Sequence, residues 1–101
     1  MEQDLSKLME SATRASESLK CLAHELRLLT ICFIGSGEKT VQELENFLGT
    51  SQSNMSQHLS KLKDKGFLTS RKQANQVFYR IKEPKVLELV TALQEIYCRK
   101  D

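Results

Sequence analysis

The spacing of apolar residues changes twice along this 101-residue chain, and this change constrains the fold more than any other feature. Up to Gly66, apolar residues recur at intervals of three and four, which is typical of amphipathic helices. Between residues 67 and 81 they alternate, and from Pro84 onward the helical interval returns. We therefore expect a mainly helical α+β fold, with five helices and a two-stranded β-hairpin before the last helix.

Two apolar segments open the chain. Residues 5–23 carry a single apolar stripe, whereas residues 26–34 are apolar on more than one face and are expected to form a central core helix. The turn sequence Gly35-Ser36-Gly37 ends the second segment. The spacing alone leaves open whether the two segments form one long helix or two.

Capping residues mark the next two helices. Thr40 and Glu43 have the spacing of a capping box, ahead of a short apolar stripe that Gly49 ends. Ser51 is a good N-cap for the following helix. In that helix the residues expected to face the core are Met55, Leu59 and Leu62.

The alternating segment predicts a β-hairpin. Residues 67–72 and 77–81 are strand-like, and Asn75, in the polar turn between them, tolerates a positive φ. Alternation places one of the two aromatic residues, Phe78 or Tyr79, in the core. The proline at the start of the final helix is tolerated in a first turn.

Positive charge is concentrated in one third of the chain. The formal net charge is only +2, yet residues 51–82 hold seven Lys or Arg and a single acidic residue. A basic block on a nearly neutral domain indicates a surface that faces a polyanion. An ordinary solvated face would have the same composition, so charge alone does not decide between the two.

Nothing in the sequence indicates a membrane or an oxidising compartment. No apolar run approaches the roughly 20 residues that span a bilayer, and the polar start is not followed by an apolar signal segment. We expect a single cytoplasmic domain over residues 1–101 whose three cysteines rest as thiols. No Cys-x-x-Cys motif, glycine-rich phosphate loop or acid/base set indicates an enzyme, and no cofactor is expected.

Two short helical segments joined at Gly49-Thr50-Ser51 are typical of a helix-turn-helix, and the basic hairpin after them makes it a winged helix-turn-helix. Side chains opposite the core stripe of the second segment are short hydrogen-bonding groups, which suit base edges in the major groove. The predicted DNA-binding residues here are Gln52, Ser53, Asn54, Ser56, Gln57, His58, Ser60 and Lys61. Because His58 lies nearer the apolar side, we expect it to pack or to contact phosphate.

Cations around this helix are expected to contact phosphates, which position a protein on DNA without reading its sequence. The predicted phosphate contacts are Lys61, Lys63, Lys65, Arg71, Lys72, Arg80 and Lys82. A simpler alternative is a polar surface helix on an interaction adaptor that does not bind DNA. RNA is a further alternative, but the hairpin lacks the several aromatic residues of a stacking platform.

Three stretches of the sequence form a recognisable pattern. They are Leu-Lys-Cys-Leu-Ala-His-Glu-Leu-Arg-Leu at residues 19–28, Ser-Gln-Ser-Asn-Met-Ser-Gln-His-Leu at 51–59 and Val-Phe-Tyr at 77–79. In this pattern, which extends over almost the whole chain, the sequence resembles the ArsR (ArsR/SmtB) family of bacterial winged-helix repressors. The resemblance implies a helix break near His24 and a homodimer through the first and last helices. It also implies an inverted-repeat operator in double-stranded DNA.

Two cysteines extend the resemblance to one branch of the family. The contexts Leu-Leu-Thr-Ile-Cys at Cys32 and Ile-Tyr-Cys at Cys98 are similar to those of the HlyU/BigR/SqrR branch. That branch uses a cysteine pair in these helices as a switch for sulfide, persulfide or oxidant. The resemblance therefore implies that Cys32 and Cys98 form a redox-sensing dithiol, with a reactive sulfur species or an oxidant as inducer.

Other uses of the cysteines remain open. The Cys-x-Cys metal motif of the family is absent, and so is its zinc pattern on the last helix, so no metal site is expected. However, Cys21 and His24 are three residues apart and can share a helical face, which keeps a metal-responsive repressor with Cys/His ligands as an alternative. Cysteine is also often a small buried hydrophobe, and Cys21 has no role in the dithiol scheme.

Overall fold

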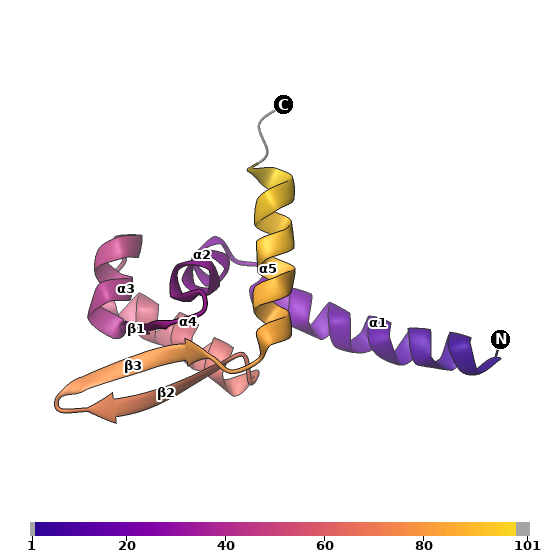
Figure 1. Ribbon diagram of the computed structural model, residues 1–101, viewed down its shortest axis with the longest axis horizontal. Helices are drawn as coiled ribbons and strands as arrows, with labels where there is room; N and C mark the ends of the chain where they lie inside the picture. The colour runs from indigo at the N-terminus through magenta and orange to yellow at the C-terminus, as the bar shows by residue number, and fades with distance from the viewer. Residues whose placement is uncertain (1, 99–101) are drawn as a thin grey trace.

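His24 divides the N-terminal apolar region into two helices, α1 (Glu2–Leu22) and α2 (Glu25–Ile34). Its backbone is extended, and its Nδ1 accepts a hydrogen bond from the backbone N–H of Leu26 at 3.2 Å. This is an N-cap, so the helix break implied by the family resemblance is confirmed. The computed structural model describes residues 2–98 (Figure 1), so the ends of the predicted domain lie outside the described residues.

Both predicted caps of the helix-turn-helix are present. The Thr40 hydroxyl accepts from the Glu43 N–H at 3.1 Å, and the Thr40 N–H donates to the Glu43 carboxylate at 2.8 Å. These bonds begin α3 (Val41–Leu48), which ends at Gly49 with a φ of +63°. Ser51 caps α4 (Gln52–Asp64) through a 3.1 Å bond from the backbone N–H of Asn54.

The wing has three strands rather than the two predicted. Strands β2 (Leu68–Gln73) and β3 (Gln76–Ile81) form the expected hairpin. The short strand β1 (Glu38–Thr40) pairs antiparallel with the other edge of β3, which gives the order β1-β3-β2. Three residues are too few to show an alternation, so sequence periodicity could not reveal this strand.

The hairpin turn also differs from the prediction. The strands extend to the pair Gln73–Gln76, which leaves only Ala74 and Asn75 to connect them. Two-residue hairpin connections require a positive φ at the first or at both central residues. In this turn Ala74 adopts it, with φ 58°, and Asn75 does not. Asn75, which tolerates a positive φ, is thus not the residue that supplies it in this turn.

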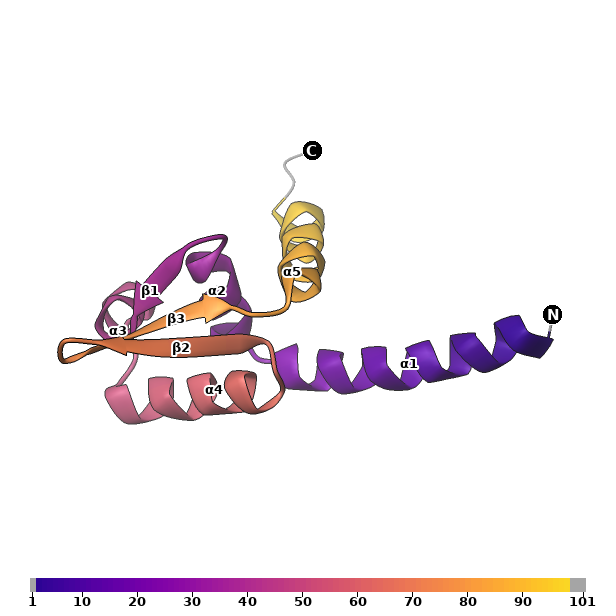
Figure 2. The same ribbon diagram turned by 60° about the horizontal axis from the view of Figure 1, so that its bottom comes forward.

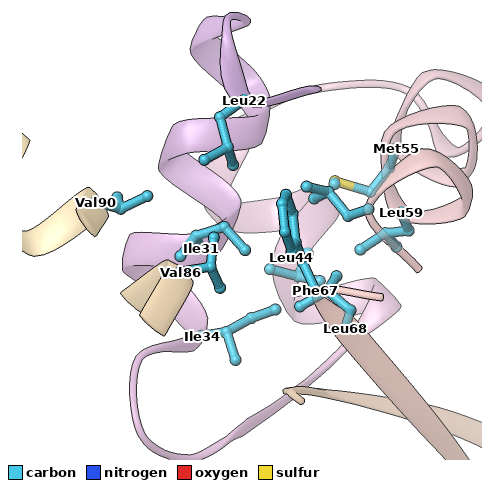
Figure 3. Packing of buried hydrophobic residues seen from close by; sticks show 11 residues of the cluster. Leu22, Ile31, Ile34, Leu44, Met55, Leu59, Phe67, Leu68, Val86 and Val90 are labelled. Carbon is cyan, nitrogen blue, oxygen red and sulfur yellow. The ribbon is translucent and has the colours of Figure 1, made fainter. Parts of the chain in front are cut away.

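The core lies where the helices meet the base of the wing (Figure 3). Its buried apolar residues are Leu22, Ile31, Ile34, Leu44, Met55, Leu59, Leu62, Phe67, Leu68, Val86 and Val90. The inward stripe predicted for α4 is thus confirmed. Tyr79 packs against this cluster, and the last helix, α5 (Pro84–Tyr97), contributes its first half to it. Figure 2 shows α4 lying along β2, which places the wing beside the helix-turn-helix.

Six of the eight large apolar side chains that remain exposed among the described residues lie on α1 and α5. Helix α1 projects from the rest of the molecule in Figures 1 and 2, and only its last residue, Leu22, is buried in the cluster. The large apolar residues left exposed on α1 and α5 are Leu5, Leu8, Met9, Leu19, Ile96 and Tyr97. Among the described residues, no helix is both long enough and apolar enough to cross a membrane.

Candidate nucleic-acid interface and cysteine pair

Helix α4 presents a polar face to solvent. The exposed residues on it are Gln52, Ser53, Ser56, Gln57, Ser60 and Lys61. Most of them recur three and four apart, opposite Met55 and Leu59, because the helix has 3.6 residues per turn. Six of the eight helix residues predicted to bind DNA therefore lie on an accessible surface of hydroxyl, amide and ammonium groups.

Asn54 contributes to the turn rather than to this surface. It is half-buried, and its Nδ2 donates to the Thr50 hydroxyl at 2.8 Å. The side chain thereby links the first turn of α4 to the loop before it. Its amide group is hydrogen-bonded within the turn, whereas the neighbouring Gln52 and Ser53 are exposed to solvent.

His58 lies inside the protein, with 5% of its surface exposed. Its Nδ1 accepts a hydrogen bond from Nε of Arg27 at 3.1 Å. Burial lowers the pKa of His58, and the nearby His24, Arg27 and Lys61 lower that pKa further. Of the two roles predicted for His58, the structure shows packing. Its side chain lies on the buried side of α4, away from the exposed residues that were predicted with it.

Strand alternation separates the cations of the wing into two groups. Ser70 of β2 faces α4, because its hydroxyl accepts a 2.8 Å hydrogen bond from Nζ of Lys63. Successive residues of a strand face opposite sides, so Lys72 shares the face of Ser70. Arg71 and its near neighbour across the ladder, Arg80, lie on the other face of the sheet. The three predicted contacts are therefore not equivalent.

Arg71 is held in an ion pair on that other face. Its Nε and Nη2 each donate to a carboxylate oxygen of Glu38 at 2.8 Å, and its guanidinium carbon lies 4.5 Å from the centre of the Phe78 ring. The hydrogen bond to Arg71 lowers the pKa of Glu38, and the same bond raises the pKa of Arg71. Lys61 lies on the polar face of α4 and Lys72 on the face of β2 that contacts α4, whereas Arg71 lies on the other face of the sheet.

The two predicted sensing cysteines lie on α2 and at the end of α5, two helices that pack against each other. Cys32 is half-buried on α2, and Cys98 is exposed at the C-cap of α5, the helix that packs against α2. Burial raises the pKa of the Cys32 thiol, and the charge of a Cys98 thiolate raises it further. This electrostatic influence connects two thiols that lie 66 positions apart in the sequence.

The third cysteine lies at a different place. The half-buried Cys21 thiol points toward the backbone carbonyl of Lys61 on α4, with a sulfur–oxygen distance of 3.9 Å. Nδ1 of His24 is occupied by the cap of α2, which leaves Nε2 as the ring nitrogen that could act as a ligand alongside Cys21. Within the described part of the chain, no group of three His, Cys, Asp or Glu side chains gathers where it could hold a metal ion.

Sequence reasoning missed Arg27 and Glu38. Both act through partners more than 30 positions away, His58 and Arg71 respectively, which no local pattern reveals. One signal was present, because Arg27 is the only charged residue in the apolar segment 26–34. A lone charge in a core helix requires a buried partner.

Comparison with known proteins identifies the family. The family described as "Bacterial regulatory protein, arsR family" matches residues 24–70. A biofilm growth-associated repressor of Xylella fastidiosa (strain Temecula1 / ATCC 700964) is 38% identical over 90 residues, which cover 89% of this chain and 79% of that protein. The chain belongs to the ArsR family. The resemblance inferred from residues 19–28, 51–59 and 77–79 is thereby confirmed.

Solved structures support the same assignment for this ArsR-family regulator. Reduced HlyU from Vibrio cholerae has a TM-score of 0.86 and 34% identity, covering 92% of this chain and 98% of that one. A homodimeric winged helix-turn-helix DNA-binding domain from Mycobacterium bovis has a TM-score of 0.71 and 25% identity, covering 91% of this chain and 82% of that one. The winged helix fold is shared, and the relatives are transcriptional regulators rather than enzymes.

Proposed function

We propose that this regulator is a repressor that binds an inverted-repeat operator as a homodimer and releases it when Cys32 and Cys98 become covalently joined. The exposed polar face of α4 carries the DNA-binding part of this proposal. On it, Gln57 offers an amide that suits adenine, and the serine hydroxyls suit either partner of a base pair. Lys61 and Lys72 supply cations for the flanking phosphates.

The exposed apolar residues of α1 and α5 support the homodimer. Leu8 and Met9 are more than 60% exposed on α1, and Tyr97 is 82% exposed near the end of α5. Side chains of this kind, repeated along a helix that projects from the body, are typical of an interface. A two-fold dimer would place two copies of α4 roughly 34 Å apart, which matches half-sites one helical turn apart.

The placement of the two thiols on packed helices, with Cys98 raising the pKa of Cys32, supports the switch. In the proposed chemistry the exposed Cys98 thiolate attacks the outer sulfur of a persulfide RSSH, and RS⁻ leaves as a protein persulfide forms. The Cys32 thiolate then attacks the Cys98 sulfur and expels HS⁻. Protons from the two thiols and from RSSH end on RSH and H₂S. A further persulfide would supply an extra sulfur, and such a bridge spans a longer gap than a disulfide.

The DNA-binding part is tested with a duplex that the reduced protein selects from a randomised pool. We expect affinity to fall steeply as salt rises. Lys61→Glu should weaken binding to every duplex, whereas Gln57→Ala should mainly change the preferred sequence. An interaction adaptor would instead show no salt-dependent affinity for duplex DNA, and that result would contradict the proposal.

The switch is tested by mass spectrometry of the intact protein after exposure to a persulfide donor. We expect one intramolecular link between Cys32 and Cys98, with a mass that reports the number of added sulfur atoms, and loss of affinity for the selected duplex. Cys32→Ser should bind the duplex equally before and after treatment. Cys21→Ser is the matched control and should respond as the parent does. A Cys32→Ser protein that still responded would exclude the dithiol.

A further inference from the structure

One arginine connects three elements at the junction of α1 and α2. Arg27, on the first turn of α2, donates from Nε to Nδ1 of His58 on α4 at 3.1 Å. From Nη1 the same guanidinium donates to the backbone carbonyl of Cys21, at the end of α1, at 2.8 Å. Both bonds are partly buried. A planar group with donors on two edges fixes the directions of both partners at once.

Two further contacts join the same junction to α4. The His24 ring lies 4.2 Å from the His58 ring, measured between centroids. The Cys21 thiol points toward the Lys61 carbonyl, one helical turn further along α4. The α1–α2 junction therefore contacts the recognition helix at the His58 ring and at the backbone carbonyl of Lys61.

The chemistry of the central bond makes it directional. A guanidinium has only donors, so Nδ1 of His58 must be the unprotonated nitrogen that accepts. The apolar contacts of Met55, Leu59 and Leu62 hold α4 against the core but are not directional. A single buried hydrogen bond can then decide the rotation of the helix about its own axis.

We propose that Arg27 is a positioning residue for DNA recognition, which sets the rotation of α4 through His58 and ties it to α1 through the Cys21 carbonyl. The inference rests on the proposed function, in which the outer face of α4 reads DNA. Gln57 directly precedes His58, so a rotation at His58 displaces the amide that faces the bases. Functional groups must be held within roughly 0.5 Å for productive contacts, so a small rotation is sufficient to reduce specificity.

The test compares the affinity for the duplex selected by the parent with the affinity for a random duplex. His58→Leu removes the acceptor and puts an apolar side chain of similar size in its place. We expect the ratio of the two affinities to fall by about tenfold, the effect of one mismatched base pair. His58→Gln restores an acceptor oxygen and should recover most of the ratio. Binding to random duplex should change little, because the exposed lysines remain.

A matched control separates positioning from loss of stability. Leu62→Val, on the same buried side of α4, weakens packing without touching the hydrogen bond and should leave the ratio unchanged. Arg27→Lys keeps the positive charge, but a single ammonium group cannot donate to His58 and to the Cys21 carbonyl in the directions that the guanidinium does. This variant should therefore lower the affinity ratio as His58→Leu does. In the double variant Arg27→Lys, His58→Leu, the affinity ratio should fall no further than in either single variant. The reason is that each substitution removes the same hydrogen bond.

The outcomes distinguish this inference from the proposed function. If the parent binds its selected duplex and His58→Leu retains the parent ratio, the positioning role is wrong while the DNA-binding proposal stands. The positioning role would also be wrong if Leu62→Val lowered the affinity ratio as much as His58→Leu does. Additive losses of this ratio in the double variant would contradict it as well. If the parent shows no salt-dependent affinity for duplex DNA, both proposals fail together.

Discussion

Among single residues, His58 shows how burial governs chemistry on the recognition helix. Its neighbours Gln57 and Ser56 are exposed, yet its own ring is almost fully removed from water. A protonated imidazole there would lose hydration and would face the cation of Arg27, which already requires Nδ1 as an acceptor. The neutral ring is therefore the form compatible with the folded protein, which agrees with its lowered pKa.

This lowered pKa predicts that acid destabilises the fold. In the unfolded chain His58 has an ordinary pKa of about 6.5, so as pH falls the unfolded state takes up the proton first. The contribution of His58 to the free energy of unfolding is complete above the pKa of the unfolded state. It declines as the pH falls toward the lower pKa of the folded state. Urea unfolding between neutral and mildly acidic pH measures the decline.

His58→Gln has no proton to gain and should show a smaller decline than the parent over the same range. The residual slope in this variant reports the carboxylates, which begin to titrate at the acidic end. His24→Gln leaves the buried ring in place and removes only one of the smaller causes of its lowered pKa, so it should retain most of the decline. Parallel curves for the parent and His58→Gln would show that His58 does not titrate differently in the folded protein.

At the scale of elements, the wing depends on a two-residue turn and a short third strand. The connection between β2 and β3 places Ala74 at a φ of 58°, where a Cβ is disfavoured. Glu38 of β1 then reaches across β3 to Arg71 of β2, so one ion pair spans the full width of the sheet. The shape of the wing thus rests on a local backbone conformation and on a contact distant in sequence.

The turn is tested by comparing the same substitution at two adjacent positions. Ala74→Val places a β-branched side chain at positive φ and should lower the free energy of unfolding by about 1 kcal/mol. Asn75→Val, in the same exposed turn but without positive φ, should cost less. Chemical denaturation of both variants measures the difference. An equal cost at the two positions would contradict the assigned turn.

At the scale of the whole molecule, the projecting α1 leaves an apolar stripe uncovered by the rest of the protomer. Its exposed stripe runs from Leu5 to Leu19, and a groove of about 640 Å³ lies between α1, the start of α5 and the turn after α4. A second copy would cover the apolar side chains of both helices. The small protomer core, built around the base of the wing, would then be extended by the interface.

A charge on the stripe should therefore separate the two copies. We expect Leu8→Glu to shift the protein from dimer to monomer in analytical ultracentrifugation, because a carboxylate is costly to bury. Lys7→Glu, on the opposite side of α1, introduces the same side chain and should leave the dimer intact. A parent protein that sedimented as a monomer at all concentrations would refute the proposed dimer.

The elements themselves were predictable from the sequence because their signals are local. Helical spacing, the caps at Thr40 and Ser51, and the alternation of the hairpin each involve residues within a few positions of one another. The inward stripe of α4 follows from the same spacing, and with it most of the candidate DNA-binding face. The helix break at His24 required the family resemblance, since periodicity continues through it.

Tertiary structure decided the features that join distant residues. The partnership of Arg27 with His58, the capture of Arg71 by Glu38 and the addition of β1 to the sheet all depend on how the chain closes on itself. The packing of α2 against α5, which carry Cys32 and Cys98, is of the same kind, because these helices lie far apart in the sequence. Local sequence sets which face of an element is apolar, whereas packing determines which polar group meets which, because a buried donor or charge must find its partner wherever the fold places one.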